Sequence, residues 1–309
     1  MKTKKIYIDG DAGTTGLEIV ARLQARTDLE VLKVDPNLRK DPVYKLSLAK
    51  QADLIILCLP DQAAIEAVKL YSDVNTKILD ASSAHRIAEG WVYGMPELGF
   101  REDILKAQKV ANPGCYPTGF LLAVTPLIRA GLMPTDYPVT VNAISGYSGG
   151  GRKMIESYEE TTGDSLAVRL YGLGLDHKHL PEMERYSGLV HPPVFAPSVA
   201  NFKQGMLVSI PLQTAKLGLS GERILQVWQK TYATEPFVSV VDEPSNLLDS
   251  SFLGATNVNG SNQVELCCFS RPGQALLVAR LDNLGKGASG AAVQNLNLML
   301  GLEERSGLS

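Results

Sequence analysis

A strand, a glycine-rich loop and a helix follow one another at the start of the chain, and this order constrains the fold more than any other feature. The β-rich run Lys5–Asp9 leads into glycines at positions 10, 13 and 16, followed by a helical pattern over Leu17–Arg26. Glycines so placed permit a tight turn, close approach of the backbone to a pyrophosphate, and close helix–strand packing. The helix N-terminus then faces the phosphates. The sequence therefore predicts half of a mononucleotide-binding unit.

Strands and helices go on alternating through the first third of the chain. The largely apolar run Ala52–Pro60 is typical of a strand that is covered on both faces of a parallel sheet. Asp61 is placed to cap the helix that follows it. Short loops between alternating elements predict a Rossmann-type, doubly wound parallel sheet of the α/β class. The other elements of this half are expected at Leu29–Val34, Gln62–Tyr71, Lys77–Asp80 and Lys109–Ala111.

After Gly119 strands dominate, and the expected helix Ser220–Tyr232 has Ser220 as its N-cap. Pro211 cannot donate to a ladder, so its strand is expected to be an edge strand or to end there. This half is predicted to be an α+β domain with a mixed or antiparallel sheet. We expect a dinucleotide-binding domain over 1–115, with a helix in 286–309 packing back on it, and a catalytic and oligomerisation domain over 116–285. The predicted strands are Val139–Ile144, Leu207–Leu212, Val238–Val241, Val264–Phe269 and Ala275–Leu281.

Composition excludes several classes of protein. Of 309 residues, 45% are hydrophobic and 20% charged, with a net charge of −3, so neither nucleic acid nor an anionic membrane is expected as a partner. The four cysteines lack metal-type spacing, and Cys267 and Cys268 point to opposite faces of a strand, so no metal and no disulfide framework is expected. With no apolar stretch of about 20 residues and no signal peptide, a reducing cytoplasm is the expected setting.

The stretch Asn112–Thr118 reads Asn-Pro-Gly-Cys-Tyr-Pro-Thr and lies between a strand and an apolar helix pattern. Its two prolines and its glycine predict a sharp turn that places Cys115 in the first turn of the helix. The helix dipole there favours a thiolate, although a lone cysteine is more often a small buried hydrophobe. We interpret Cys115 as a nucleophile, and beside a dinucleotide fold this suggests covalent catalysis coupled to hydride transfer.

Such chemistry needs a proton carrier, and His177 and His179 lie two residues apart, on one face if the chain is extended. Glu182 could orient an imidazole. A solvated loop is the competing interpretation, and a metal site lacks a third ligand nearby. His191 is read as structural, and His85 as a loop residue without a clear partner.

Two loops could bind ligands. Backbone donors in the glycine-rich loop Ser145–Arg152, together with Arg152 and Lys153, could hold an anionic substrate. Ser82 and Ser83 follow the end of a strand, where parallel sheets bind their ligands. The alternatives are an ordinary surface loop and a pair of turn serines.

These motifs together resemble the N-acetyl-gamma-glutamyl-phosphate reductases, in their short form, over essentially the whole chain. The resemblance rests on the three glycines, on Asp80-Ala-Ser-Ser-x-x-Arg86, on the cysteine stretch, on Ser145-Gly-Tyr-Ser-Gly149, on His177-x-His-x-Pro-Glu182, and on Lys286-Gly-Ala-Ser-Gly-Ala-Ala-Val-Gln-Asn295.

The resemblance implies an enzyme of arginine biosynthesis that reduces N-acetyl-glutamyl 5-phosphate to the 5-semialdehyde through a thioester on Cys115. It implies a homotetramer or homodimer formed through the second domain. His177, which we favour, or His179 would be the acid/base, with Glu182 in support. Substrate would be bound by Asn112, Ser145, Tyr147, Ser148 and Arg152. Cofactor binding is assigned to Gly10, Gly13, Thr14, Thr15, Gly16, Arg39, Cys58, Pro60, Ser82, Ser83, Ala288, Ser289 and Gly290.

The cofactor assignment has two readings. Asp35 follows the second predicted strand, where an acid favours NAD by binding a ribose hydroxyl. Arg39 and Lys40 could instead hold a 2′-phosphate, and because the family uses NADP we expect NADP. Alternatives for the whole protein are an aspartate-semialdehyde dehydrogenase, a dinucleotide-sensing regulator and a redox switch, the last of which would need a second cysteine near Cys115.

Overall fold

The computed structural model describes residues 3–161 and 166–309, and the chain divides into two compact units. Unit 1 comprises Met1–Pro113 and Ala288–Ser309, and unit 2 comprises Gly114–Gly287. The chain therefore crosses from one unit to the other twice, once directly before Cys115 and once after Gly287.

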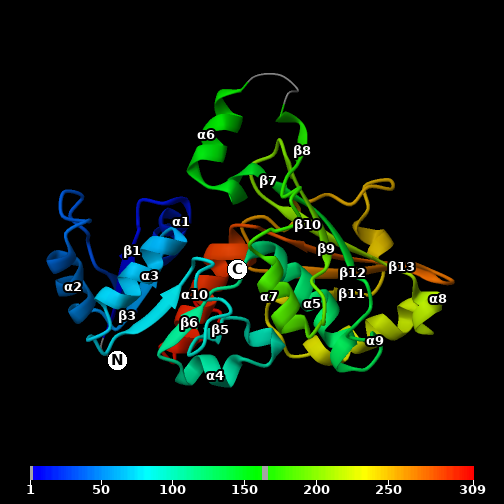
Figure 1. Cartoon of the computed structure of the whole chain (residues 1–309), viewed down its shortest axis with the longest axis horizontal. Helices are drawn as coiled ribbons and strands as arrows, with labels where there is room; N and C mark the ends of the chain where they lie inside the picture. Colours follow the sequence, from blue (N-terminus) through cyan, green and yellow to red (C-terminus); the bar gives the residue numbers. More distant parts are fainter. Residues whose placement is uncertain (1–2, 162–165) are drawn as a thin grey trace. The chain divides into compact units, whose positions relative to one another are not determined.

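Unit 1 is built on a six-stranded parallel sheet with the order β2-β1-β3-β4-β6-β5 (Figure 1). Asp9, Leu57, Asp80 and Ala111 are paired in one row across β1, β3, β4 and β6. The loops that follow these four strands therefore leave the sheet at the same edge, which is where open parallel sheets bind ligands. The strands are β1 (Lys4–Asp9), β2 (Leu29–Val31), β3 (Leu54–Leu57), β4 (Lys77–Asp80), β5 (Val92–Tyr93) and β6 (Lys109–Ala111).

Helices cover both faces of this sheet, which confirms the predicted doubly wound architecture. Buried Ile6, Ile8 and Ile56 face helices α1, α4 and α10, while Tyr7 and Ile55 face α2 and α3. This alternation explains why the strands are apolar throughout. The helices are α1 (Thr14–Leu23), α2 (Pro42–Gln51), α3 (Asp61–Leu70), α4 (Arg101–Lys106) and α10 (Gly290–Met299), with a short 3₁₀ turn η1 (Pro96–Leu98).

Unit 2 contains a seven-stranded mixed sheet with the order β11-β12-β13-β10-β7-β9-β8. Only the pairs β11/β12 and β7/β9 are parallel. This is the mixed sheet that was predicted for the second half of the chain. Its strands are β7 (Thr140–Gly146), β8 (Val168–Leu170), β9 (Val194–Ala200), β10 (Met206–Leu212), β11 (Val238–Val241), β12 (Val264–Arg271) and β13 (Gln274–Leu281).

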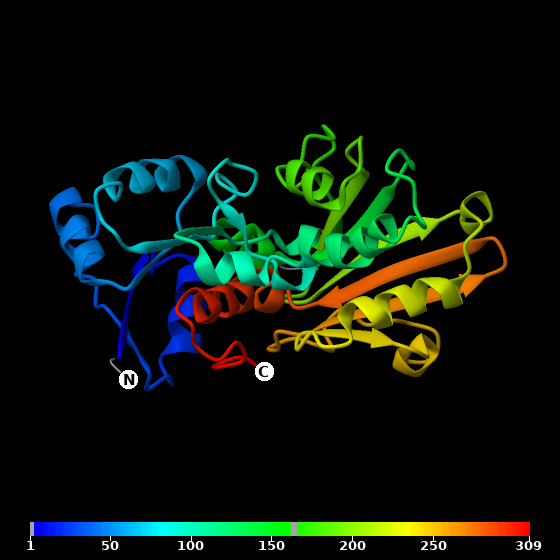
Figure 2. The same cartoon turned by 90° about the horizontal axis from the view of Figure 1, so that it is seen from below.

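Helices α5, α7 and α9 pack together on one face of this sheet (Figure 1). Gly119 lets α5 approach closely, because a Cβ there would lie 3.0 Å from Val208 and 3.1 Å from Ala279. Figure 2 shows α9 alongside β12 and β13, and buried Trp228 on α9 donates to the carbonyl of Ala123 on α5. The helical segments are α5 (Cys115–Arg129), α6 (Arg152–Glu160), α7 (Leu180–Ser187), α8 (Thr214–Leu217), α9 (Gly221–Tyr232), η2 (Tyr147–Gly150), η4 (Pro244–Leu247) and the π-helical turn η5 (Gly285–Ser289).

Several predicted boundaries differ from the observed ones. The first helix begins at Thr14 instead of Leu17, and the second strand already ends at Val31. Asp61 lies in the first turn of α3, whereas the predicted cap of Ser220 on α9 is present. Pro211 lies in β10, which is an interior strand, but β7 pairs only with residues 206–209, so at Pro211 the strand pairs with β13 alone.

Neither a membrane-spanning helix nor a metal-type cluster is found among the residues that the structure describes. No helix within 3–161 or 166–309 is long and apolar enough to cross a membrane. In the same part of the chain, no three His, Cys, Asp or Glu side chains gather as they would around a metal ion.

Candidate active site

Cys115 is the first residue of α5, with Gly114 as the N-cap, and its side chain is half-buried. The Thr118 hydroxyl donates to the Gly114 carbonyl at 2.9 Å, and the Thr118 N–H donates to the same oxygen. The turn therefore presents the cysteine at the positive end of a helix whose body is buried. This is the local geometry that the two prolines and the glycine predicted.

Glu182 lies in the first turn of α7 and is buried, with 1% of its surface exposed. Its Oε2 accepts the N–H of Gly114 at 3.1 Å. A carboxylate in this position holds the backbone directly before Cys115. The sequence suggested Glu182 as a partner for an imidazole, and its contact with Gly114 is one that the spacing of residues could not reveal.

His177 and His179 lie in a turn that leads into α7, and not in an extended strand. The Leu180 N–H donates to the His177 carbonyl, and the His179 N–H donates to Nδ1 of His177 at 3.2 Å. The ring centroids of the two histidines are 4.7 Å apart. Because Nδ1 of His177 accepts a hydrogen bond, the neutral ring carries its proton on Nε2.

Both histidine rings pack against Tyr116, the residue that follows Cys115. The centroid of the Tyr116 ring lies 6.0 Å from that of His177 and 5.9 Å from that of His179. Phe195 closes the cluster at 5.1 Å from both Tyr116 and His177. The predicted proton carriers thus belong to one aromatic cluster within unit 2, which includes the residue that follows the predicted nucleophile.

Tyr171 belongs to this cluster and was missed by the sequence analysis. Its hydroxyl is 2.9 Å from that of Tyr116. Burial, together with the neighbouring charge of Cys115, raises the pKa of both phenols well above the usual range. Both therefore stay protonated at neutral pH. The hydroxyl of Tyr171 donates to that of Tyr116, which in turn donates to the Ser198 carbonyl at 3.4 Å. A single tyrosine more than 50 residues from the cysteine carries no sequence signal for this role.

The glycine-rich loop after β7 is held in place by a second loop. The N–H groups of Gly146, Tyr147 and Ser148 donate to carbonyls of residues 205, 202 and 203. These three backbone donors, which the sequence suggested as anion ligands, are therefore already occupied. The Ser145 hydroxyl donates to the Gly146 carbonyl, and Ser148 Oγ accepts a hydrogen bond from within the unit. Arg152 begins α6 and is exposed.

A pocket of about 340 Å³ lies beside this loop and includes Tyr171 in its wall. Lys153 on α6 and Arg169 on β8 supply positive charge to it, so an anionic group could be accommodated. Arg169 was not singled out from the sequence. The remaining lining residues are Gly150, Met154, Ser157, Tyr158, Leu170 and Val199.

In unit 1 the glycine loop has the geometry of a phosphate-binding turn. Gly10 has φ +97°, and a Cβ there would lie 2.4 Å from the Cys58 carbonyl oxygen. A Cβ on Gly16 would lie 2.4 Å from the Gly10 carbonyl oxygen. The Gly13 N–H donates to that same oxygen, and Gly13 is the N-cap of α1, whose first turn contains Thr14 and Thr15. Because only glycine fits at positions 10 and 16, the backbone of this turn can approach a dinucleotide pyrophosphate closely.

The loop after β4 is fixed by two carboxylates. Ser82 donates to Asp80 at 2.7 Å, and Ser83 donates to Asp61 through both its N–H and its hydroxyl. His85 was expected to lack a clear partner, and this expectation was wrong. Its Nδ1 lies 2.6 Å from Asp80 Oδ2 and its ring stacks on a tryptophan, because the loop folds back over the strand end.

Asn112 is buried, and its side chain bonds within unit 1. Nδ2 donates to the Ala288 carbonyl at 3.0 Å, and Oδ1 accepts from Asn295 at 3.1 Å. Asn112, which was predicted to bind substrate, therefore joins the segment before the first chain crossing to the segment after the second. Ser289 accepts from Arg22, and buried Gly290 begins α10.

The residues predicted to choose between NAD and NADP lie after β2. Asp35, Arg39 and Lys40 are exposed, and Asp35 Oδ1 accepts the N–H of Asn37 at 2.9 Å. Cys58 and Pro60 follow β3, in the loop that contacts Gly10.

Comparisons with known proteins agree with this arrangement. Residues 5–107 match the family described as "Semialdehyde dehydrogenase, NAD binding domain", and residues 115–283 match "Semialdehyde dehydrogenase, dimerisation domain". An N-acetyl-gamma-glutamyl-phosphate reductase of Trichormus variabilis is 53% identical over the full length of both chains. A relative of the same name, with the suffix 2, from Pseudomonas putida is 46% identical over 99% of this chain and 100% of its own.

Solved structures share the fold at low identity. Aspartate semialdehyde dehydrogenase II of Vibrio cholerae superposes with a TM-score of 0.70 at 14% identity, covering 97% of this chain and 99% of its own. A probable aspartate-semialdehyde dehydrogenase of Pseudomonas aeruginosa gives a TM-score of 0.73 at 14% identity, with the same coverage.

The environments of the four cysteines predict selective alkylation. Burial raises the pKa of Cys267 and of Cys268 to about 11, and it raises that of Cys58 far above the usual range. A thiol with that pKa is ionised to about 0.1% at pH 8, so iodoacetamide should modify half-buried Cys115 first. Labelling of Cys267 and Cys268 should rise as the pH approaches 11. Peptide mass spectrometry measures the order, and earlier labelling of Cys267 at pH 8 would contradict it.

Proposed function

The chain belongs to the N-acetyl-gamma-glutamyl-phosphate reductase family, and on that premise we propose that it reduces N-acetyl-glutamyl 5-phosphate to N-acetyl-glutamate 5-semialdehyde. The observation that carries the proposal is the placement of Cys115 at the start of α5, beside the aromatic cluster with His177 and His179. An enzyme of arginine biosynthesis that has four free cysteines suits a reducing cytoplasm.

The reaction begins at Cys115. Its thiolate attacks the carbonyl carbon of the acyl phosphate, a carbon–sulfur bond forms, and inorganic phosphate leaves. Sulfur is used because the resulting thioester keeps its carbonyl electrophilic. A nicotinamide cofactor, when bound, would supply the hydride that reduces this carbon. The tetrahedral oxygen that forms carries negative charge, and the backbone N–H of Cys115 at the helix start is a candidate donor to it.

The histidine pair moves the proton. The protonated histidine first gives a proton to the negatively charged oxygen, which forms the thiohemiacetal. As the thiohemiacetal collapses, its hydroxyl returns that proton to the histidine, the carbon–sulfur bond breaks, and the aldehyde and the Cys115 thiolate are released. His177 is half-buried and so can exchange its proton with solvent, while its Nδ1 is occupied by the His179 N–H. We therefore assign the proton transfer to His177, with His179 orienting its ring. Glu182 supports the site by holding Gly114.

The cation-lined pocket beside Tyr171 is proposed to take the anionic end of the substrate. Lys153 and Arg169 line it, and Arg152 begins the same helix as Lys153. These groups suit the carboxylate that N-acetyl-glutamyl phosphate carries in addition to its acyl phosphate.

A phosphate-dependent oxidation assay tests the reaction in reverse. With N-acetyl-glutamate 5-semialdehyde, phosphate and NADP⁺, the wild-type protein should form NADPH, and Cys115→Ser should reduce turnover by at least about 10³-fold. Cys267→Ala is the matched control, because that thiol is buried in β12, and it should retain turnover. Undiminished turnover in Cys115→Ser would disprove the thioester route. Turnover with aspartate semialdehyde alone would instead favour the aspartate-semialdehyde dehydrogenase reaction.

We propose NADP as the cofactor. One oxygen of Asp35 is used locally, and two exposed cations, Arg39 and Lys40, follow it closely. Loss of a charge-assisted contact to the 2′-phosphate costs about 10- to 100-fold in binding. Arg39→Ala should therefore raise the KM for NADPH by that factor and leave the KM for NADH unchanged. Lys69→Ala, an exposed lysine on α3, is the control. An equal rise in the KM for NADPH and for NADH would show that Arg39 does not bind the 2′-phosphate.

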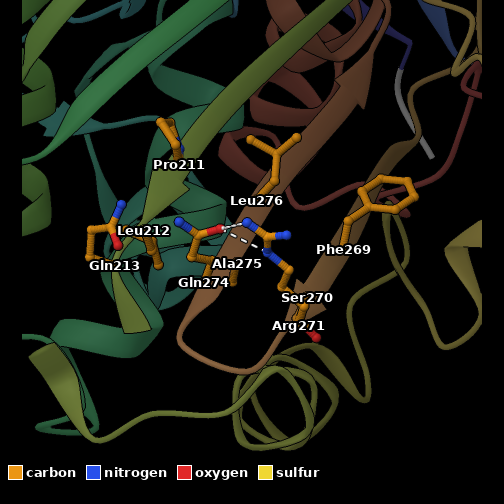
Figure 3. Close-up of a pocket in the computed structure, with 9 residues that line it drawn as sticks. All are labelled: Pro211, Leu212, Gln213, Phe269, Ser270, Arg271, Gln274, Ala275 and Leu276. Carbon is orange, nitrogen blue, oxygen red and sulfur yellow. Dashed lines mark hydrogen bonds between the residues drawn. The ribbon is translucent and has the colours of Figure 1, made fainter. Parts of the chain in front are cut away.

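We also propose a homo-oligomer formed through the uncovered face of the unit 2 sheet. A pocket of about 420 Å³ is lined by residues of β10, β12 and β13. Its apolar lining includes Pro211, Phe269 and Leu276, which are drawn in Figure 3. Leu276 is 39% exposed although it lies in a central strand. The family description "dimerisation domain" covers this region. An apolar sheet face suits a second copy of the chain.

Leu276→Glu should shift the protein towards monomer, because it replaces an exposed apolar side chain in the middle of this face by a carboxylate that must be desolvated at an interface. Light scattering across a dilution series measures the mass. Val43→Glu is the control, since Val43 is a 77% exposed residue on α2 of unit 1. A wild-type protein that is monomeric at all concentrations would refute the assembly, and an unchanged mass in Leu276→Glu would refute this face.

A further inference from the structure

Two buried polar residues, Asp282 and Asn283, follow β13 directly and have no part in the chemistry described above. Asp282 is 0% exposed and Asn283 is 2% exposed. They lead into the π-helical turn η5, which is an uncommon conformation found most often at functional sites. Buried polar groups of this kind are retained where their hydrogen bonds hold something in place.

Asn283 is bonded to two different loops. Its Oδ1 accepts the N–H of Gly205 at 2.8 Å, and its Nδ2 donates to Ser148 Oγ at 2.9 Å. Gly205 ends the loop whose carbonyls accept the N–H groups of residues 146–148. Asn283 therefore fixes the proposed substrate loop directly, through Ser148, and indirectly, through Gly205.

Asp282 fixes the turn itself. Oδ1 accepts the N–H of Leu284 at 2.8 Å, and Oδ2 accepts the N–H of Gly260 at 2.8 Å and the side-chain amide of Gln204. Its backbone carbonyl accepts the N–H of Gly287 at 2.9 Å. A carboxylate with three donors is satisfied without solvent, so the turn has little freedom to move.

Gly287 brings this turn against the nucleophile. A Cβ on Gly287 would lie 2.8 Å from Cβ of Cys115 and 3.0 Å from the Asp282 carbonyl oxygen. Carbon atoms in ordinary contact are about 3.5–4.0 Å apart, so only glycine fits there. The position of the turn therefore limits where the backbone and Cβ of Cys115 can lie.

We propose that Asp282 and Asn283 are positioning residues that hold the substrate loop and the seat of Cys115 in one rigid arrangement. The proposal rests on the proposed function, because it assigns the loop at Ser148 to substrate and Cys115 to nucleophilic attack. Asn283 acts on the substrate side and the Asp282–Gly287 turn acts on the cysteine side, so the two sides should separate in kinetics. Misplacement of reacting groups by about 1 Å costs about 10²-fold in rate.

Asn283→Leu tests the substrate side. It keeps the volume but removes both hydrogen bonds, so KM should rise about tenfold or more while the alkylation rate of Cys115 stays near the wild-type value. Asn283→Asp should restore much of the KM, because its carboxylate can accept from both Gly205 and the Ser148 hydroxyl. Asn283→Ser, which is smaller and polar but too short to span both loops, replaces the leucine variant if that one fails to fold. Thermal melting monitors folding in each case.

Gly287→Ala tests the cysteine side. The added methyl must displace Cys115, so kcat and the rate of iodoacetamide alkylation should both fall about tenfold or more, with a smaller change in KM. Asn297→Leu is the matched control for a lost buried asparagine, since Asn297 bonds to the C-terminal segment of unit 1. It should lower the melting temperature and leave KM, kcat and alkylation unchanged.

The outcomes separate this proposal from the proposed function. If wild-type protein turns over but Asn283→Leu has the kinetics of Asn297→Leu, or if Gly287→Ala is alkylated as fast as wild type, the positioning role is overturned. If wild-type protein shows no turnover with N-acetyl-glutamate semialdehyde, the proposed function falls. In that case, a comparison of the alkylation rates of Gly287→Ala and wild type would still show whether the turn at Gly287 positions Cys115.

Discussion

The hydrogen bond from the Gly114 N–H to the buried Glu182 carboxylate is the contact on which the site depends. A carboxylate buried to this degree needs hydrogen-bond donors, and this bond ties the first turn of α7 to the start of α5. The residue that caps α7 is His179, and His177 precedes it in the same turn. This bond therefore ties the backbone directly before Cys115 to the helix that the two histidines precede. The ring of Tyr116 packs against both imidazoles.

Rigidity extends from this contact to segments that look flexible in the sequence. Residues 145–151, at the end of β7 and directly after it, include four glycines, yet the N–H groups at 146–148 are all bonded to a neighbouring loop. Asn283 bonds to the same segment through Ser148, and Gly287 packs closely against Cys115. Gly146 serves close approach of backbone segments, because a Cβ there would lie 2.6 Å from the backbone nitrogen of Gln204. A preorganised arrangement of this kind is what acyl transfer requires, because groups held in place need no reordering as the reaction proceeds.

In unit 1, the parallel sheet itself brings together the loops that carry the predicted cofactor-binding residues. Four neighbouring strands end in one row, and the loops after them carry Gly10, Cys58, Ser82 and Asn112. Asp80, at the end of β4, binds both Ser82 and His85 and so shapes the loop between them. Because the strands are parallel and in register, residues that are distant in sequence gather at the edge of the sheet where such sheets bind ligands.

The sequence alone determined the features that depend on neighbouring residues. These are the alternation of strands and helices, the glycine turn before α1, the place of Cys115 at the start of α5 and the cap of Ser220 on α9, each set by local backbone preference or hydrophobic period. Only the tertiary structure decided that Glu182 binds Gly114, 68 residues away, that Tyr171 joins Tyr116, and that Asn283 bridges two loops. No local pattern specifies such partners, because a buried polar side chain takes whichever donor or acceptor the packing of distant elements brings within reach.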